Sequence, residues 1–337
     1  MITDAITKLM ENKDLTYDEA FLCMNEIFEN EANEIQVAAY LTALRMKGET
    51  VEEISASAKG MRNHAVHLEH EGMEVLEIVG TGGDCANSFN ISTTSGLVAA
   101  AAGIPVAKHG NRSVSSKCGA ADVLEALGAN IVLEPEKMSQ VLRETNICFM
   151  FAQIYHNAMK YVAPVRNALG VRTIFNILGP LTNPANASMQ LMGVYDEALV
   201  EPMAKVLSKL GVKNGMVVYG QDCLDEISLS AATTVCEIHN GELKSYILEP
   251  EMFGFDKCDK GELEGGNPEE NAAITKAILN GEKGARRNAV VLNAAACIYI
   301  AKKTDTMKEA VQLAENVIDC GKAMEVLNQF VALTNAY

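Results

Sequence analysis

The first part of the chain repeats apolar side chains at every third or fourth position, which is the spacing of an amphipathic helix. Thr16, Asn33 and Thr50 each stand three residues before a glutamate or a glutamine, and this arrangement is typical of a capping box at a helix start. The sequence therefore marks three helix starts. We expect a small helical domain over residues 1–70.

From residue 74 onward the pattern changes to short apolar runs that alternate with amphipathic stretches. The runs that predict buried strands lie at residues 75–79, 104–107, 131–133, 148–152, 190–194 and 215–219. The stretches that predict helices lie at residues 97–103, 121–127, 136–144 and 198–210. This alternation is typical of parallel strands connected by crossover helices, so we expect an α/β domain with a mostly parallel sheet flanked by helices.

A second helical region interrupts this alternation. Residues 156–169 have the pattern of one helix. Pro180 and Pro184 end a further short segment at residues 173–178, because proline does not continue a helix.

The last part of the chain combines a hairpin with helices. Residues 234–239 and 243–247 are joined by Asn240-Gly241, a strong two-residue turn signal, and predict an antiparallel pair of strands. The helices expected to close the chain lie at residues 267–285, 289–302, 307–320 and 322–333.

Length and charge narrow the possible functions. The chain has 337 residues, which exceeds the usual size of a single hydrophobic core, so we expect two domains. The net charge of −16 argues against nucleic acid as a partner, because a nucleic-acid surface needs a basic patch. It does not argue against a phosphorylated substrate, because distant surface charges are screened beyond about 8 Å whereas a local cation acts at contact distance.

The cysteines and the apolar runs indicate the compartment. Nine cysteines occur without a Cys-x-x-Cys pair, so neither a disulfide framework nor a zinc site is indicated. No leader segment is recognisable and no apolar run is long enough to span a bilayer, so we expect a cytoplasmic protein without membrane contacts.

His64, His67 and His70 could be a metal cluster, but a polar linker is the better interpretation because no cysteine or carboxylate supports a metal site there.

The first stretch with functional character follows the strand predicted at residues 75–79. There the sequence GTGGD begins at Gly80, and Asn90, Ser92 and Thr93 stand just ahead of the next predicted helix. Glycines let the backbone approach a ligand closely, and a helix start offers unpaired N–H groups with about half a positive charge. Together these residues predict an anion-binding site.

A second polar loop is predicted after the strand at residues 104–107. It carries Lys108, His109, Asn111 and Arg112, and in an open α/β sheet it leaves the same edge as GTGGD. Each loop alone is more simply a tight turn or a solvated loop. Their combination favours a phosphate ligand, although the glycine spacing matches neither the ATP-binding P-loop nor the dinucleotide fingerprint.

A pair of adjacent carboxylates forms a third candidate. Asp225 and Glu226 follow the strand predicted at residues 215–219. Hard oxygen ligands at the carboxyl end of a strand suit Mg²⁺ bound together with a substrate phosphate. Taken alone, such a pair is common on any surface loop.

Several of these motifs resemble the anthranilate phosphoribosyltransferase family. They are GTGGD at Gly80, NIST at Asn90, KHGNRSVSS at Lys108, GAADVLEALG at Gly119, HNAMKYVAPVRNALGVRTIFNILGPLTNPA at His156 and DEIS at Asp225. The resemblance spans nearly the whole chain in the family's order. It implies transfer of the phosphoribosyl group of 5-phosphoribosyl 1-pyrophosphate (PRPP) to the amine of anthranilate, with release of pyrophosphate, in tryptophan biosynthesis.

The resemblance also implies how the chain is divided. Residues 1–70, completed by about 155–185, would form a discontinuous helical domain that makes a homodimer contact. Residues 74–154 and 187–337 would form the α/β domain that binds PRPP.

The family match assigns roles to individual residues. Lys108 would stabilise the charge that develops on the departing pyrophosphate, together with Mg²⁺ held by Ser92, Asp225 and Glu226. The residues matched to PRPP binding are Gly80, Gly83, Asp84, Ser88, Asn90, Ile91, Ser92, Thr93, Lys108, Asn111, Ser116 and Ala120. The residues matched to anthranilate binding are Gly80, His109, Asn111, His156 and Arg166.

The chain departs from the family pattern at some of these positions. Ser88 stands where the family more often has threonine, and Ala120 stands where a serine usually contacts the donor. Loss of that hydroxyl removes one hydrogen bond, on the order of 1 kcal/mol, which is too little to abolish function. Asn157 replaces the proline that usually follows the histidine matched by His156. The resemblance therefore does not determine the shape of the acceptor entrance.

Two other functions are compatible with part of this pattern. A pyrimidine nucleoside phosphorylase would share the architecture and a glycine-rich phosphate loop, but the Asp225-Glu226 pair and the KHGNRSVSS run favour the transferase. A transferase-like protein that binds nucleic acid would be expected to lose the carboxylate pair and gain a basic groove, whereas this chain keeps the pair and is acidic.

Overall fold

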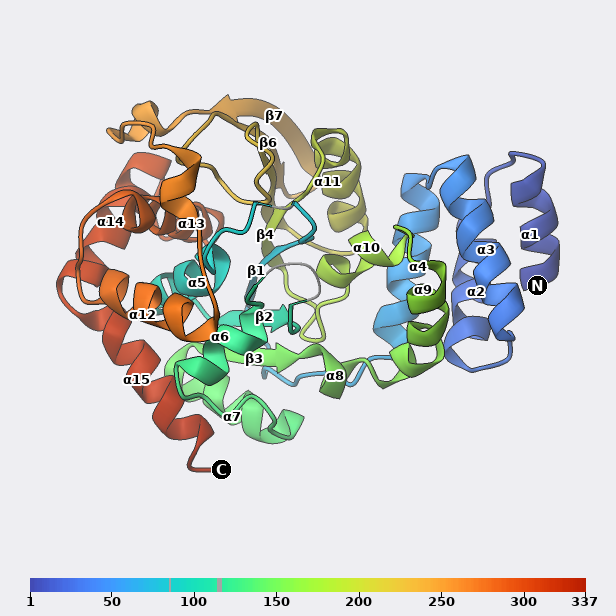
Figure 1. The fold of residues 1–337 in the computed structure, drawn as a ribbon, viewed down its shortest axis with the longest axis horizontal. Helices are drawn as coiled ribbons and strands as arrows, with labels where there is room; N and C mark the ends of the chain where they lie inside the picture. Colours follow the sequence, from blue (N-terminus) through green and yellow to red (C-terminus); the bar gives the residue numbers. More distant parts are fainter. Residues whose placement is uncertain (85, 114–116) are drawn as a thin grey trace.

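The computed structural model describes residues 1–84, 86–113 and 117–337. It consists of a small helical domain that contains the N-terminus and a larger α/β domain built on one seven-stranded sheet (Figure 1). The expected fold class is therefore confirmed. No helix in the described part of the chain is long and apolar enough to cross a membrane.

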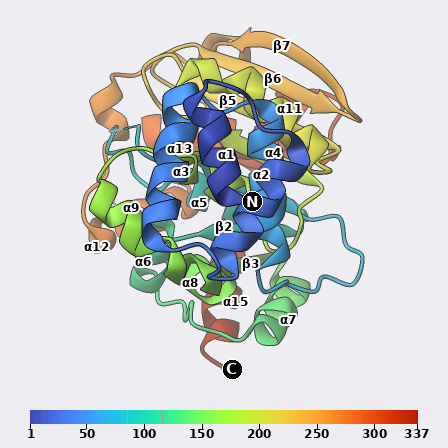
Figure 2. The ribbon, with the colours of Figure 1, turned by 90° about the vertical axis from the view of Figure 1, so that its right-hand side faces the viewer.

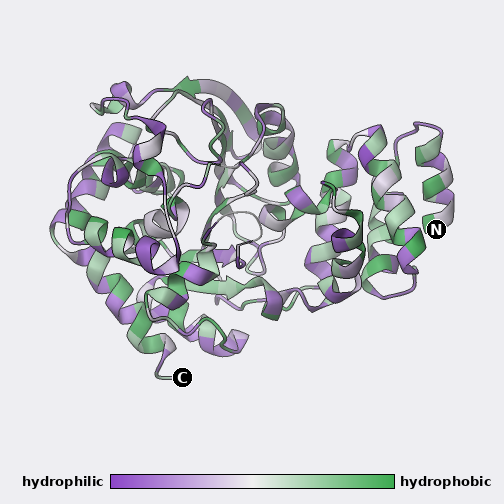
Figure 3. Ribbon diagram, in the orientation of Figure 1, coloured by the Kyte–Doolittle hydropathy of each residue, from purple (hydrophilic) through white to green (hydrophobic). Residues whose placement is uncertain are grey.

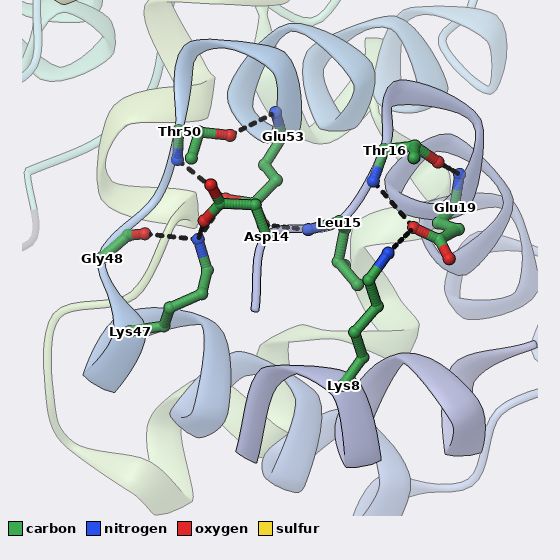
Figure 4. Close-up of polar contacts among 9 residues, drawn as sticks. All are labelled: Lys8, Asp14, Leu15, Thr16, Glu19, Lys47, Gly48, Thr50 and Glu53. Atoms are coloured by element: carbon green, nitrogen blue, oxygen red, sulfur yellow. Dashed lines mark hydrogen bonds and ion pairs between the residues drawn. The ribbon is translucent and has the colours of Figure 1, made fainter. Parts of the chain in front are cut away.

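The helical domain begins with four helices whose starts are fixed locally. They are α1 (Ile2–Met10), α2 (Tyr17–Phe28), α3 (Glu34–Lys47) and α4 (Val51–Asn63). Capping boxes at Thr16, Asn33 and Thr50 are all present, which confirms the three predicted helix starts. Figure 4 shows two of these boxes, in which Glu19 and Glu53 reach back to the preceding backbone.

A second set of short helices returns to this bundle. It comprises α8 (Ala152–Tyr155), the 3₁₀ helix η1 (Asn157–Tyr161), α9 (Ala163–Leu169), α10 (Phe175–Leu178) and the 3₁₀ helix η2 (Gly179–Leu181). Helix α9 packs against α3 and α10 against α4. Val162, Val165 and Phe175 accordingly share a hydrophobic core with the N-terminal helices. These contacts support a helical domain of residues 1–70 completed by about 155–185, which we propose as the division of the chain.

The prediction of a single helix over residues 156–169 is wrong. The structure has η1 followed by α9, with a break at Val162. Pro164 explains the break, because proline lacks an N–H group and is accepted only in the first turn of a helix. A new helix therefore begins at Ala163.

The sheet has the strand order β3-β2-β1-β4-β5-β6-β7. Its strands are β1 (Leu76–Gly80), β2 (Val106–Gly110), β3 (Ile147–Phe151), β4 (Met189–Gly193), β5 (Asn214–Gly220), β6 (Thr233–His239) and β7 (Glu242–Leu248). Neighbours from β3 to β5 are parallel, whereas β6 and β7 are antiparallel, as the hairpin signal predicted. The turn at Asn240 and Gly241 has φ angles of 50° and 89°, the left-handed geometry that these two residues accept readily.

One predicted strand is absent and another is displaced. Residues 131–133 form no strand, although Ile131 and Leu133 are buried and Val132 is exposed. The alternation of burial is real, but these residues pair with none of the described strands. Strand β2 runs over Val106–Gly110 instead of residues 104–107, so part of the predicted polar loop belongs to the sheet.

Helices cover both faces of the sheet. The remaining α-helices are α5 (Ile91–Ala101), α6 (Ala120–Ala126), α7 (Pro135–Thr145), α11 (Val200–Lys209), α12 (Pro268–Leu279), α13 (Ala285–Ile300), α14 (Met307–Asp319) and α15 (Lys322–Thr334), and the remaining 3₁₀ helices are η3 (Glu197–Leu199), η4 (Pro250–Phe253) and η5 (Lys260–Leu263). Helix α5 packs against β1, β2 and α13, whereas α11 packs against β5, β6 and α4. The outer helices carry hydrophobic and hydrophilic stripes (Figure 3), and the rotated view shows the N-terminal helices standing in front of the sheet (Figure 2).

The direction in which successive strands are added to the sheet reverses between β1 and β4. From β1 the chain moves outward to β2 and β3, then returns to β4 on the other side of β1. In open α/β sheets a ligand binds at the carboxyl ends of the strands beside such a reversal. The candidate site should therefore lie where GTGGD leaves β1.

Candidate active site

Glycines at the ends of β1 and β4 allow a close approach of the Asp225 loop. Gly80 ends β1 and Gly193 ends β4. A Cβ atom on Gly80 would overlap the Asp225 carboxylate, and one on Gly193 would overlap the Asp225 backbone. Glycine at both positions therefore lets Asp225 lie directly against the carboxyl edge of the sheet.

The GTGGD loop is bound to Asp225 and to a distant arginine. The Gly82 N–H donates to the Asp225 carboxylate at 2.7 Å, and the Asp225 N–H donates to the Asp84 carboxylate at 3.4 Å. The Gly83 carbonyl accepts a hydrogen bond of 2.8 Å from the Arg172 guanidinium. The loop is thus fixed from two sides by residues far away in the sequence.

The start of α5 is the predicted anion site, and a carboxylate partly occupies it. Asn90 is the N-cap residue without a side-chain cap, and the Ser92 N–H donates to the Glu226 carboxylate at 3.1 Å. Asn90 is held by Cys118 and Asn271 through hydrogen bonds of 3.3 and 2.9 Å. Ser92 and Thr93 lie in the first turn of α5 and not ahead of it as predicted.

The ammonium of Lys108 points into this site from the sheet. Lys108 was expected in a polar loop, but it lies within β2 and is 3% exposed. Its Nζ donates to the Ile78 carbonyl at 2.6 Å and to the Ser92 hydroxyl at 3.3 Å. Burial lowers the pKa of Lys108, and the negative charges of Glu77 and Glu226 oppose that effect. The lysine is therefore a buried cation directed at the start of α5.

The carboxylates of Asp225 and Glu226 are buried beside each other. Burial and the neighbouring Asp84 carboxylate raise the pKa of Asp225 to about 7, and burial and Asp225 raise that of Glu226 to about 8. Adjacent carboxylates with raised pKa values are a suitable environment for a divalent cation, which would relieve their repulsion.

The side chains available as metal ligands fit only an ion that binds together with its substrate. Among the described residues, no group of three or more histidine, cysteine, aspartate or glutamate side chains could by itself hold a metal ion. Mg²⁺ is commonly held by one or two carboxylates together with substrate phosphates, so Asp225 and Glu226 fit an ion that binds with its substrate.

Two histidines form a separate group next to Lys108. His109 lies in β2 and His156 follows α8, and their ring centroids are 4.9 Å apart with an edge-to-face angle of 62°. Burial lowers the pKa of His109 well below its ordinary value and lowers that of His156 to about 4. The Nε2 atoms of both rings are buried and have no hydrogen-bond partner among the described residues. Two neutral imidazoles thus offer unused polar atoms to a ligand.

The other residues predicted to bind PRPP lie on several different elements. Asn111 follows β2 and its side chain accepts from the Arg112 N–H at 2.8 Å. Ser88 pairs with Glu264 in an isolated bridge, Ile91 is buried at the start of α5, and Ala120 begins α6. Ser116 lies outside the described residues.

Neither Arg112 nor Arg166 has a contact with a described residue that identifies its role. Arg112, expected to stay with the donor loop, is exposed and pairs with Asp122 and Glu125 of α6. Arg166 lies in α9, and its guanidinium stands 5.5 Å from the centre of the Phe175 ring. No contact between Arg166 and the two histidines is recorded within the described residues, so its role in the acceptor site stays a prediction.

Three residues at the site were missed by sequence reasoning. Arg172 contacts the GTGGD loop and stacks over Tyr195 at 4.1 Å. Glu77 and Asn183 lie beneath Lys108 and His109, and Glu77 is completely buried. Glu77 left a signal in the sequence, since it is the one charged residue in the apolar run 75–79. Arg172 and Asn183 lie within the run quoted from His156, but their residue types do not distinguish them from their neighbours there.

Comparison with known proteins agrees with this geometry. Residues 72–324 match the model of the α/β domain of a glycosyl transferase family, and residues 3–65 match the model of its helical bundle domain. The chain is 62% identical over 335 residues to an anthranilate phosphoribosyltransferase of Lachnoclostridium phytofermentans, and the match covers 99% of both chains. The chain belongs to the anthranilate phosphoribosyltransferase family.

Solved structures of family members share the whole fold. The anthranilate phosphoribosyltransferase of Thermus thermophilus has a TM-score of 0.94 and 43% identity, with 98% of this chain and 99% of that chain covered. The Saccharomyces cerevisiae enzyme in complex with PRPP and Mg has a TM-score of 0.91 and 27% identity, with 100% and 98% covered. The similarity therefore extends over both domains.

Proposed function

We propose that this protein transfers the phosphoribosyl group of PRPP to the amine of anthranilate, giving N-(5-phosphoribosyl)anthranilate and pyrophosphate in tryptophan biosynthesis. The observation that carries this function is the meeting of Lys108, the start of α5 and the Asp225-Glu226 pair at one edge of the sheet. This arrangement belongs to a chain that is 62% identical to a named family member.

The departure of pyrophosphate is the step of the reaction that most needs help from the enzyme. A C–N bond forms at the anomeric carbon while the C–O bond to pyrophosphate breaks, and the aromatic amine is a weak nucleophile. Stabilisation of the developing negative charge is therefore the main task of the site. Lys108 is suited to it, because its buried ammonium acts at contact distance in a low-dielectric environment.

The donor would be held by the GTGGD loop and by the first turn of α5. We assign this role to Gly80, Gly83, Asp84, Ser88, Asn90, Ile91, Ser92, Thr93, Asn111, Ser116 and Ala120. Ser92, Asp225 and Glu226 would hold Mg²⁺, which when bound neutralises phosphate charge. The buried hydroxyl of Thr93 has no hydrogen-bond partner among the described residues, as expected of a group that contacts substrate.

The acceptor would lie beside the two histidines. We assign anthranilate binding to Gly80, His109, Asn111, His156 and Arg166. The neutral rings of His109 and His156 present an apolar surface and two polar atoms to an aromatic amine. A planar guanidinium such as that of Arg166 matches the carboxylate of anthranilate.

We also propose a cytoplasmic homodimer that contacts neither membrane nor nucleic acid. Met10, Ile35 and Met46 are large apolar side chains exposed on α1 and α3, and they fit a contact between helical domains of two copies. Cys23 and Cys148 are buried free thiols, which fits a reducing compartment. The net charge of −16 argues against a nucleic-acid partner.

One assay tests the proposed reaction. The purified protein is mixed with anthranilate, PRPP and Mg²⁺, and the loss of anthranilate fluorescence is followed over time. We expect consumption that needs both PRPP and Mg²⁺. A folded protein that leaves anthranilate unchanged but cleaves thymidine in the presence of phosphate would instead be a nucleoside phosphorylase. Tight binding in a gel shift at physiological salt would favour the nucleic-acid alternative.

A further inference from the structure

The ladder between β1 and β2 stops after its first pair. The Leu76 N–H donates to the Pro105 carbonyl at 2.8 Å, and Leu76 lies opposite Val106. By contrast, β1 pairs with β4, and β2 with β3, over five residues each. A regular parallel ladder between β1 and β2 would continue with the Ile78 N–H bonded to the Ala107 carbonyl and the His109 N–H bonded to the Ile78 carbonyl.

Side chains take the place of these missing backbone partners. The His109 N–H donates to both carboxylate oxygens of Glu77 at 3.1 Å. The Ala107 carbonyl accepts from the Asn183 amide at 2.8 Å, and the Ile78 carbonyl accepts from Lys108 Nζ at 2.6 Å. The Ile78 and Ala107 carbonyls and the His109 N–H are therefore satisfied by inserted side chains in place of backbone groups.

Glu77 and Asn183 act as one unit in this gap. The Asn183 amide donates to the Glu77 carboxylate as well as to Ala107. Its orientation is fixed, because its carbonyl oxygen accepts from the Ala185 N–H at 2.8 Å. Glu77 and Asn183 are 0% and 1% exposed, so these bonds are shielded from bulk solvent.

A carboxylate at this position is costly to the fold. Burial raises the pKa of Glu77 to about 8, and the nearby Lys108 charge and the hydrogen bonds from Asn183 and His109 oppose this rise. An apolar residue in the same place would let β1 and β2 pair normally, and replacement of buried charges by apolar residues is often neutral or stabilising. The cost therefore points to a role outside stability.

We propose that Glu77 is a positioning residue for phosphoribosyl transfer, which with Asn183 keeps the carboxyl halves of β1 and β2 apart so that Lys108 reaches Ser92. In a closed ladder the Ile78 carbonyl would be bonded to the backbone of His109, and the Lys108 ammonium would lose one of its two acceptors. This inference rests on the proposed function.

The conservative variant Glu77→Gln tests the proposal. It keeps the shape of the side chain but turns one oxygen into an NH₂ donor that faces the Asn183 amide. We expect kcat to fall by at least about tenfold while the KM values for anthranilate and PRPP stay within about threefold, since Lys108 acts on the transition state. An unchanged kcat in the folded variant would overturn the proposal.

A matched control separates positioning from mere stability. Glu53 is also 0% exposed, and its carboxylate accepts from a backbone N–H at Leu15 and from Lys47, both at 2.8 Å, but it lies in the helical domain (Figure 4). Glu53→Gln should lower the thermal midpoint of unfolding and leave kcat near the parent value. If both variants lose kcat to the same extent at a temperature where both are folded, the effect is one of stability and the proposal is wrong.

An exchange of the two side chains covers the case in which Glu77→Gln does not fold. The double variant Glu77→Gln with Asn183→Asp returns one carboxylate to the gap, keeps an acceptor for the His109 N–H, and moves the amide donor from position 183 to position 77. We expect it to fold with a kcat of at least about a tenth of the parent value, and a lower kcat would contradict the proposal. A parent protein without transferase activity would refute the proposed function, whereas an active parent with an unaffected Glu77→Gln variant refutes only this inference.

Discussion

The Lys108 ammonium donates a hydrogen bond to the Ser92 hydroxyl, with 3.3 Å between the two atoms. This contact joins β2 to the first turn of α5, where the Ser92 N–H already binds Glu226. A cation, a helix start and a carboxylate thus converge on one point. Such a point suits a ligand that carries both negative charge and a metal ion.

The first prediction concerns the charge of Lys108. Lys108→Ala should lower kcat far more than it changes the KM for anthranilate, because the ammonium matters most while the bond to pyrophosphate breaks. Steady-state kinetics with each substrate varied in turn measures both constants. A raised KM with an unchanged kcat would show that Lys108 only binds the ground state.

The second prediction concerns the carboxylate pair. Asp225→Asn combined with Glu226→Gln should abolish the dependence of the rate on Mg²⁺ and lower the rate sharply, because neutral amides are poor ligands for a hard cation. In the parent, Mg²⁺ with pyrophosphate should raise the thermal midpoint of unfolding, and the double variant should lose this rise. A variant that responds to Mg²⁺ like the parent would show that the metal ligands lie elsewhere.

The same double variant has a second expected property. Burial and mutual repulsion raise the pKa values of Asp225 and Glu226 to about 7 and about 8, so their charged forms weaken the fold in the absence of metal. Without Mg²⁺ the double variant should therefore unfold at a temperature no lower than the parent, as followed by circular dichroism. A clear loss of stability would mean that the carboxylates are needed for folding.

The third prediction concerns Arg166. Arg166→Ala should raise the KM for anthranilate by at least roughly tenfold, which corresponds to the loss of one charged hydrogen bond of about 1.5–3 kcal/mol, and leave the KM for PRPP nearly unchanged. The alternative is that Arg166 mainly covers Phe175, over which it stands at 5.5 Å. An equal rise in the KM values for anthranilate and PRPP would support that alternative.

The fourth prediction concerns Arg172, which reaches the GTGGD loop from the other side. Its guanidinium binds the Gly83 carbonyl at 2.8 Å and stacks over Tyr195. Arg172→Ala should raise the KM for PRPP more than that for anthranilate, the reverse of the Arg166 variant. Arg112→Ala is the matched control, since Arg112 pairs with α6 at the surface. Equal effects of the Arg172 and Arg112 variants would exclude a specific role for Arg172.

The fifth prediction concerns pH and His156. Burial lowers the pKa of His156 to about 4, so between pH 6.5 and pH 4 the unfolded chain binds a proton that the folded chain does not. Stability then rises with pH through this window, and His156 alone should remove about 2 kcal/mol of stability between pH 7 and pH 5. His156→Asn should lose less stability than the parent over the same range in urea titrations. An identical loss in both proteins would show that His156 is protonated in the native state.

Local chemistry in the sequence determined much of the fold. The capping boxes at Thr16, Asn33 and Thr50 and the Asn240-Gly241 turn are interactions within a few residues, so the same contacts form wherever the segments lie. The strand at residues 75–79 and the motif GTGGD were likewise recognisable, because a buried strand and a glycine turn need little beyond their own residues.

The tertiary structure alone decided which groups meet. Lys108 and His109 were expected in a loop, yet both are buried in β2, because they pair with Phe149 and Met150 of β3. On the other side of β2, Glu77 and Asn183 replace the backbone partners that β1 would otherwise supply. Glu77 and Asn183 are 106 residues apart. Contacts across such distances depend on the order in which strands assemble beside β1, and no local pattern of apolar and polar residues encodes that order.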